Sequence, residues 1–295
     1  MENEKVLQQD LSKEENPGAV FIVKLLFKEA PKMPERDRFT DILKKHVGEI
    51  DCFWHDEKGA GAAATDYVCH FKDADVPPQL MITPCNPYDQ SELGELERSQ
   101  LWDCPDRDRI LSECKFQVIA TDMMAAALPA KERANLDMDF TEALTELYPD
   151  CEAVYFFNSG KMFPADEIRN HNIPKEDRFI KFAVNVRFFN IQGTKDMIVD
   201  TLGMSVLYLP DLQYHFHGMG PNIIVNHAYC IASYILNSGN IIDDGDTIDS
   251  AMENGQFSRE IMWKCRHESS LIQPVRPVID IFMNQYAAGQ RENKN

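Results

Sequence analysis

Short apolar runs typical of strands and longer amphipathic segments typical of helices follow one another along this chain without strict alternation. The run 19–27, AVFIVKLLF, is strand-like, and residues 34–48 after it carry apolar side chains on one helical face. Further strands are expected at 49–55, 66–71, 79–83, 115–121 and 151–157, and further helices at 90–101 and before Tyr148. Because hairpins mix with β-α steps, this order favours an α+β fold with largely antiparallel or mixed sheets and packed helices.

The second half of the chain shows the same mixture of patterns. Residues 179–189, FIKFAVNVRFF, alternate as a strand with one buried face, and residues 194–207 are expected to form a helix. Strands at 259–266 and 275–282 close the fold. Prolines at 274 and 277 favour an edge position for the last strand, because proline cannot donate to a sheet.

Between these segments, residues 212–217 are predicted to form a strand with two different faces. Leu212, Tyr214 and Phe216 alternate with Gln213, His215 and His217, so the first three are expected in the core and the second three toward solvent. A helix is expected to begin at Pro221. It is apolar nearly all round, so it is predicted to lie between layers.

Two subdomains are predicted, since 295 residues suffice for two medium-sized cores. The polar stretch 164–177 breaks all periodicity and is expected to link an N-terminal α+β domain, 17–163, to a C-terminal α+β domain, 178–284. The polar ends are expected to be a disordered N-terminus, 1–16, and a flexible tail, 285–295.

The charge of the chain limits its partners. Its 48 acidic residues outnumber its 30 basic ones, which gives a formal net charge of −18, and no short run is rich in Lys or Arg. Such a surface repels a phosphate backbone, so nucleic acid is not expected as a ligand.

Compartment and cofactors are also constrained by the sequence. Residues 1–16 lack the features of a secretory signal and no run approaches the length of a membrane span, so a soluble, cytoplasmic protein without a membrane partner is expected. The eight cysteines include no CxxC pair, which favours reduced thiols. Because GxGxxG, Walker A and GxSxG motifs are absent, no common cofactor is expected.

Several phrases of the sequence are distinctive. They are SQLWDCP at 99–105, NSGK at 158–161, VRFFNIQGTKDMIVDTLGM at 186–204, LPDLQYHFHG at 209–218 and NHAY at 226–229. In these phrases the chain resembles a bacterial family known as domain of unknown function 4261, over about residues 19 to 285. The resemblance implies a bacterial cytoplasmic protein and assigns no catalytic residues.

Three histidines form a candidate metal site. His215 and His217 share one face of the predicted strand, and the helix after it could return His227 to within ligand distance. Neutral imidazoles suit zinc, and Asp200 or Asp211 would add a carboxylate. The alternative is that the first two histidines form the wet face of the strand while His227 is a hydrogen-bonded core residue.

Polar residues near strand ends form a candidate site for a small anion. Asn158, Ser159 and Lys161 follow one strand, and Arg187 lies in another, where its guanidinium could bind a carboxylate through two contacts. The alternative is that NSGK is a tight turn and that Arg187 pairs with a carboxylate of the protein itself.

Trp102 is the candidate for contact with a protein partner, because it stands among short polar residues at a helix end and aromatic side chains anchor interfaces. Without a catalytic signature, the chain is interpreted as a non-enzymatic binding or protein-interaction module. A metal-dependent hydrolase built on the histidines and a small-anion binder remain as alternatives.

Overall fold

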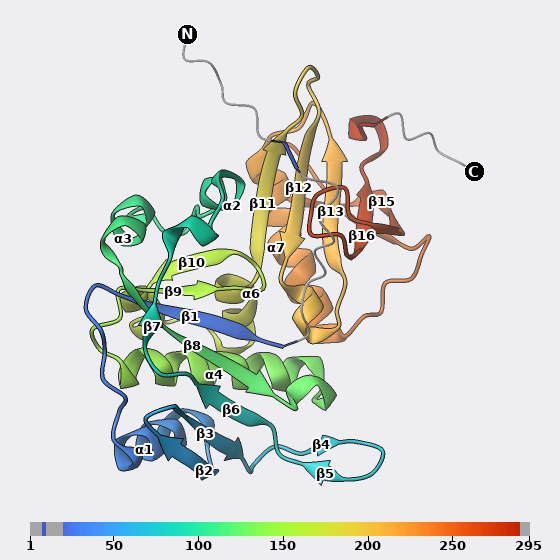
Figure 1. Ribbon diagram of the computed structural model, residues 1–295. Helices are drawn as coiled ribbons and strands as arrows, with labels where there is room; N and C mark the ends of the chain where they lie inside the picture. Colours follow the sequence, from blue (N-terminus) through green and yellow to red (C-terminus); the bar gives the residue numbers. More distant parts are fainter. Residues whose placement is uncertain (1–7, 10–19, 290–295) are drawn as a thin grey trace. The chain divides into compact units, whose positions relative to one another are not determined.

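The computed structural model describes residues 8–9 and 20–289 (Figure 1). The described chain divides into two compact units, one that ends at Ala183 and one from Val184 onward that also includes residues 8–9. We call them the N-terminal and C-terminal units. The division falls after the polar stretch 164–177, which contains two short helices. The predicted disordered and flexible ends lie outside the described residues, except for 8–9 and 285–289.

An eight-stranded antiparallel sheet forms the N-terminal unit, with its main path in the order β10-β9-β1-β8-β6-β3-β2 and with β7 paired to β8. Its strands are β1 (Ile22–Phe27), β2 (Ile50–Asp56), β3 (Gly59–Ala64), β6 (Gln79–Ile82), β7 (Asn86–Pro87), β8 (Phe116–Met123), β9 (Ala153–Phe156) and β10 (Lys161–Pro164). A separate hairpin joins β4 (Cys69–His70) and β5 (Asp75–Val76). The α-helices are α1 (Arg36–Val47), α2 (Glu95–Ser99), α3 (Arg107–Glu113), α4 (Ala130–Leu147), α5 (Ala165–Arg169) and α6 (Arg178–Ala183). The 3-10 helices are η1 (Gln90–Glu92), η2 (Ala125–Ala127) and η3 (Lys175–Asp177).

Both faces of β1 are covered, which explains why its sequence is an almost continuous apolar run. On one face Leu26 joins a buried cluster with Leu101, Cys104 and residues of α3. On the other face Phe27 packs edge-on against Tyr148, which follows α4, with 5.6 Å between ring centroids. β1 is therefore a central strand between two helical layers.

β3 was not predicted from the sequence, because its GAGAAA composition has low strand propensity. Its small residues let two aromatic rings of β2 approach closely. A Cβ atom at Gly61 would lie 2.7 Å from the ring of Phe53, and one at Gly59 would lie 2.7 Å from that of Trp54. The strand predicted at 66–71 is reduced to the two residues of β4.

The C-terminal unit is a six-stranded mixed sheet in the order β11-β12-β13-β16-β15-β14, in which only the β13–β16 pair is parallel. Its strands are β11 (Asn185–Asn190), β12 (Met197–Leu202), β13 (Asp211–Phe216), β14 (Thr247–Ala251), β15 (Phe257–Ser269) and β16 (Pro277–Phe282). Helix α7 (Pro221–Ser238) packs on β11, β12 and β13, and 3-10 helices η4 (Met204–Leu207) and η5 (Asn284–Tyr286) complete the unit.

Two segments differ from the sequence-based expectation. The predicted strand 179–189 is a helix, α6, followed by β11, because a short apolar run does not distinguish the two structures. The predicted helix 194–207 is instead β12 with η4. All but the first residue of β12 are buried, so the strand lacks the polar and apolar alternation that would have revealed it.

The prediction of an edge position for the last strand is wrong. β16 lies between β13 and β15, and it tolerates proline because Pro277 is its first residue and Pro274 precedes it. Helix α7 does not lie between layers: Ile231 and other apolar residues at helical spacing are buried, whereas Tyr234 is 46% exposed.

These sheets and helices confirm the predicted α+β class. None of the helices in the described part of the chain is long and apolar enough to cross a membrane.

Candidate functional site

A row of polar side chains crosses the sheet of the C-terminal unit. Arg187 of β11 is opposite Asp200 of β12, Asp200 is opposite Gln213 of β13, and Gln213 is opposite Asp280 of β16. We call these four residues the polar row. All four are buried, with at most 6% of each residue exposed, so the expectation that Gln213 faces solvent is wrong. Buried polar groups are stable only when they are hydrogen-bonded, so the partners of this row define its chemistry.

Arg187 and Arg276 share the carboxylate of Asp200. Arg187 donates from Nε and Nη2 to the two Asp200 oxygens at 2.9 and 2.5 Å, and Arg276 donates from Nη2 to Oδ2 at 2.8 Å. Arg276 also donates from Nε to Asp211 at 3.0 Å, and Thr201 donates to the same carboxylate at 2.9 Å. Burial raises the pKa of Asp211, and the charge of Arg276 opposes that rise.

The guanidinium of Arg187 is therefore engaged by a carboxylate of its own chain, as in the alternative interpretation of the sequence. Arg276 was not predicted from the sequence, because it lies in a loop and 65 residues or more from both of its carboxylate partners. Asp200 and Asp211, considered there as metal ligands, bind these arginines instead.

Lys161 lies in edge strand β10 of the N-terminal unit, and its ammonium group is also bound by acceptors of the protein. Its Nζ donates to the backbone oxygen of Lys181 at 2.6 Å and lies 3.4 Å from the carboxylate of Asp103. Lys181 reaches the other oxygen of Asp103 at 3.1 Å, and both ammonium groups lie over the ring of Phe163. Burial lowers the pKa of Lys161 to about 8, although Asp103 opposes the shift. Lys161 and Arg187 belong to different units.

The other residues of the NSGK phrase shape a turn. Asn158 accepts a hydrogen bond from the backbone of Ile22 and donates one to that of Val20, both at 2.9 Å. The buried Ser159 hydroxyl donates to the backbone of Phe156 at 3.4 Å. Gly160, at a φ of +65°, lies in the left-handed region that a tight turn needs.

The structure does not bring the three candidate metal ligands together. The ring of His227 contacts Tyr214, whose side chain lies on the opposite face of β13 from those of His215 and His217. Nε2 of His227 lies 2.9 Å from the backbone oxygen of Asp249, an acceptor, so this nitrogen carries the proton and Nδ1 accepts from Tyr214. Burial lowers the pKa of His227 to about 4, so the ring is neutral at pH 7.

His215 and His217 both lie close to Asp196, which precedes β12. The distances from ring nitrogen to carboxylate oxygen are 3.8 Å for His215 and 3.9 Å for His217. The His217 side chain is 44% exposed, whereas that of His215 is only 14% exposed. Across residues 8–9 and 20–289, no group of three His, Cys, Asp or Glu side chains is arranged to hold a metal ion.

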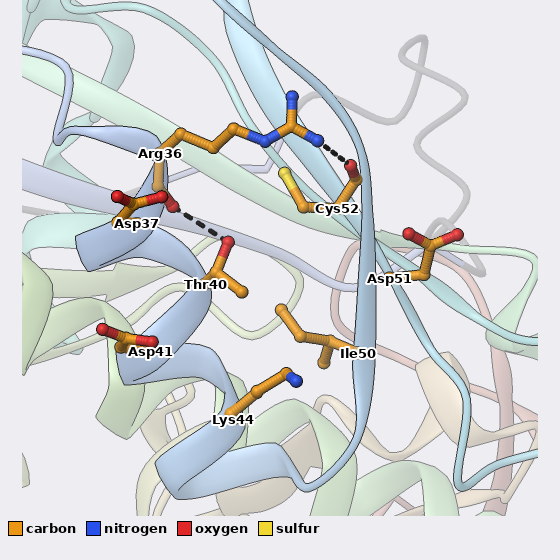
Figure 2. A pocket seen from close by; sticks show the side chains of 8 residues that line it. All are labelled: Arg36, Asp37, Thr40, Asp41, Lys44, Ile50, Asp51 and Cys52. Atoms are coloured by element: carbon orange, nitrogen blue, oxygen red, sulfur yellow. Dashed lines mark hydrogen bonds between the residues drawn. The ribbon is translucent and has the colours of Figure 1, made fainter.

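A groove of about 450 Å³ lies between α1 and β2 of the N-terminal unit. Figure 2 shows Arg36 reaching from α1 to the backbone oxygen of Cys52 in β2. The Nη2 atom of Arg36 donates to this oxygen at 2.5 Å. Arg36 and Lys44 line the groove together with the three carboxylates of Asp37, Asp41 and Asp51. This mixture of charges favours neither an anion nor a cation.

Trp102 lies on a fixed segment between α2 and α3. Leu101 before it and Cys104 after it are at most 1% exposed and belong to one buried cluster, whereas Trp102 itself is 55% exposed. Its indole Nε1 donates to the side chain of Gln100 at 3.2 Å. Asp103, which follows it, is held by the two lysines described above. The structure thus presents an aromatic surface on a segment anchored at both sides.

Fold and geometry together define an α+β protein of two units, in which the C-terminal unit combines a mixed sheet, one long helix and a buried polar row. Residues 200–282 of that unit match the model of the domain of unknown function DUF4261. The match confirms the resemblance over a segment that runs from within β12 to the end of β16. Comparisons with curated proteins and with solved structures found no match.

Proposed function

We propose that this chain is a non-enzymatic protein-interaction module of the bacterial cytoplasm, and that Trp102 anchors its partner. The observation that carries this proposal is the contrast between Trp102, which is 55% exposed, and the buried residues on either side of it. A large aromatic side chain on a preorganised segment binds at a low cost in conformational entropy, which is why such residues dominate many interfaces.

The two alternatives have less support. A metal-dependent hydrolase would need His227 beside His215 and His217, but its ring contacts Tyr214 and Asp249 on the other side of β13. A small-anion site would use Lys161 and Arg187, whose cationic groups already bind acceptors within their own units.

Site-specific photo-crosslinking tests the proposal in cells. A photoreactive amino acid at position 102 is expected to trap one defined protein, which mass spectrometry identifies. Phe157 is the matched control, because it is an aromatic residue of the same unit with a similar exposure of 51%. A crosslinker at position 157 is expected not to trap that protein.

The purified partner then allows affinities to be compared by calorimetry. Trp102→Ala is expected to weaken binding by at least 2 kcal/mol, or about 30-fold, as for other aromatic anchors at interface centres. Phe157→Ala should bind like the wild type, and both variants should keep the wild-type melting temperature. The proposal is wrong if Trp102→Ala binds with wild-type affinity, or if positions 102 and 157 trap the same proteins equally.

A further inference from the structure

The loop 270–276 joins β15 to β16 and is held in shape by buried side chains. Arg276 donates from Nη1 to the backbone oxygens of Ile272 and Pro274 at 3.1 and 2.8 Å. The Ser270 hydroxyl donates to Pro274 at 3.0 Å and accepts from the backbone of Arg276 at 3.2 Å. Because Arg276 is itself fixed by Asp200 and Asp211, the loop is tied to the interior of the sheet.

The polar row binds two further backbone groups of this loop. Arg187 donates from Nη1 to the backbone oxygen of Gln273 at 2.9 Å. Gln213 accepts from the backbone N–H of Leu271 at 2.6 Å and donates to Asp280 at 3.1 Å. A loop whose inward-facing backbone groups are hydrogen-bonded to buried side chains is rigid. Its remaining backbone groups are therefore preorganised to bind a ligand.

Two backbone groups of the same stretch bind a glutamine from the other end of the chain. The side-chain amide of Gln9 donates from Nε2 to the oxygen of Leu271 at 3.1 Å, and its Oε1 accepts from the N–H of Gln273 at 3.1 Å. A primary amide both donates and accepts along one edge, which an ionised carboxylate cannot do. Leu271 and Val275 of the same loop are 40% and 49% exposed.

We propose that the loop 270–276 is a docking site for an extended peptide segment that carries a glutamine, and that its resident occupant is the N-terminal segment of this chain around Gln9. The two hydrogen bonds are between neutral groups, so each contributes little and the contact is exchangeable. The N-terminal segment is covalently linked to the loop and therefore has an effective concentration in the millimolar range, which excludes a dilute competitor. The docking site uses residues other than Trp102, so it stands or falls independently of the proposed function.

Amide NMR and hydrogen exchange of the full-length protein test this proposal. Gln9→Ala is expected to shift the backbone amide resonance of Gln273 and to speed its exchange by roughly tenfold or more, because one acceptor is lost. Gln8→Ala is the matched control, since Gln8 is the exposed neighbour of Gln9. It should leave the Gln273 resonance unchanged.

A synthetic peptide of residues 3–15 then tests docking without the covalent link. Added at up to about 2 mM, it is expected to return the Gln273 resonance of the Gln9→Ala protein toward its wild-type position and to leave wild-type protein unaffected. The Gln8→Ala peptide should act in the same way. The Gln9→Ala and Gln9→Glu peptides should bind at least about tenfold more weakly, because a carboxylate cannot donate to Leu271.

Three results would overturn the proposal. The first is an unchanged Gln273 amide in the Gln9→Ala protein. The second is the absence of any effect of the wild-type peptide on that protein. The third is binding of the Gln9→Glu peptide as tight as that of the wild-type peptide, which would show that the bond to Leu271 contributes nothing.

Discussion

Arg276 is the residue whose loss should affect the C-terminal unit most. Its side chain is fully buried and donates to two carboxylates and three backbone oxygens. Replacement by methionine fills a similar volume but leaves Asp211 without its cationic partner and Asp200 with only Arg187. Removing one partner of a buried ion pair costs about 3–5 kcal/mol, because an uncompensated charge stays buried.

The expected change in melting temperature follows from the size of the unit. For ~110 residues, an unfolding entropy of ~2.1 cal/mol/K per residue gives about 0.23 kcal/mol/K. A loss of 3–5 kcal/mol therefore lowers the melting temperature of the C-terminal unit by about 13–22 °C. The free energy of unfolding from urea titration should fall by the same 3–5 kcal/mol.

Trp263 provides the signal for this assay, because it is 1% exposed in the C-terminal unit. Its fluorescence is isolated in a background where Trp54 and Trp102 are replaced by phenylalanine. Arg259→Met is the matched control: the Arg259 side chain is 92% exposed and lies 3.8 Å from the carboxylate of Asp249. This change should alter the free energy of unfolding by no more than about 0.5 kcal/mol.

The destabilisation of Arg276→Met should also depend on pH. Burial raises the pKa of Asp211 and Arg276 opposes that rise, so removing Arg276 raises the pKa further. When the folded-state pKa of a carboxyl group is raised, the free energy of unfolding of the protein falls as pH increases and the group ionises. The destabilisation caused by Arg276→Met should therefore be larger at pH 8 than at pH 5. Adding Asp211→Asn should recover part of it. A loss below about 1 kcal/mol, or no recovery in the double variant, would refute the reasoning.

Two other buried groups give predictions for the dependence of stability on pH. Both carboxylate oxygens of Asp137 lack a hydrogen-bond partner within the described residues, and burial followed by the charge of Asp122 raises its pKa well above the usual range. Asp137→Asn should therefore stabilise the protein by about 1–3 kcal/mol at pH 8 in urea titration. Asp139→Asn on the same helix is the control and should destabilise the protein, because Asp139 binds Lys175 and Arg178. Equal effects of the two substitutions would contradict this prediction. Because burial lowers the pKa of His227 from the usual 6.5 of a histidine to about 4, its neutral ring adds stability that is lost as pH falls from about 6.5 to 4. His227→Phe should flatten the stability curve between about pH 6.5 and 4, and an unchanged slope would show that His227 is not its source.

Local sequence patterns were sufficient for several elements. β1, α1, α4 and α7 were predicted close to their observed positions, because a long apolar run or a helical repeat depends on neighbouring residues alone. α6 and β12 were not predicted correctly. Both are short and buried on nearly all sides, so their sequences carry no periodicity that separates helix from strand.

For the candidate sites as well, the sequence predicted some features and not others. The sequence singled out Lys161 and Arg187 as candidates for a small-anion site, and in the structure both are buried and donate to acceptors of the protein itself. Their partners could not be predicted, since Asp103 lies far from Lys161 in sequence and Gln273 lies 86 residues from Arg187. The exposure of Trp102 likewise depends on the buried cluster around Leu101 and Cys104.

The sequence by itself determined the α+β class, most of the longer elements and the burial of Leu212, Tyr214 and Phe216, because these depend on the alternation of apolar residues along the chain. Only the tertiary structure decided that β16 pairs in parallel with β13, that the polar row meets Arg276, and that Gln9 binds a loop more than 260 residues away. Strand order and hydrogen-bond partners join residues that are distant in the chain. They depend on the free-energy cost of burying a polar group without a partner, and no local pattern expresses which distant residue supplies that partner.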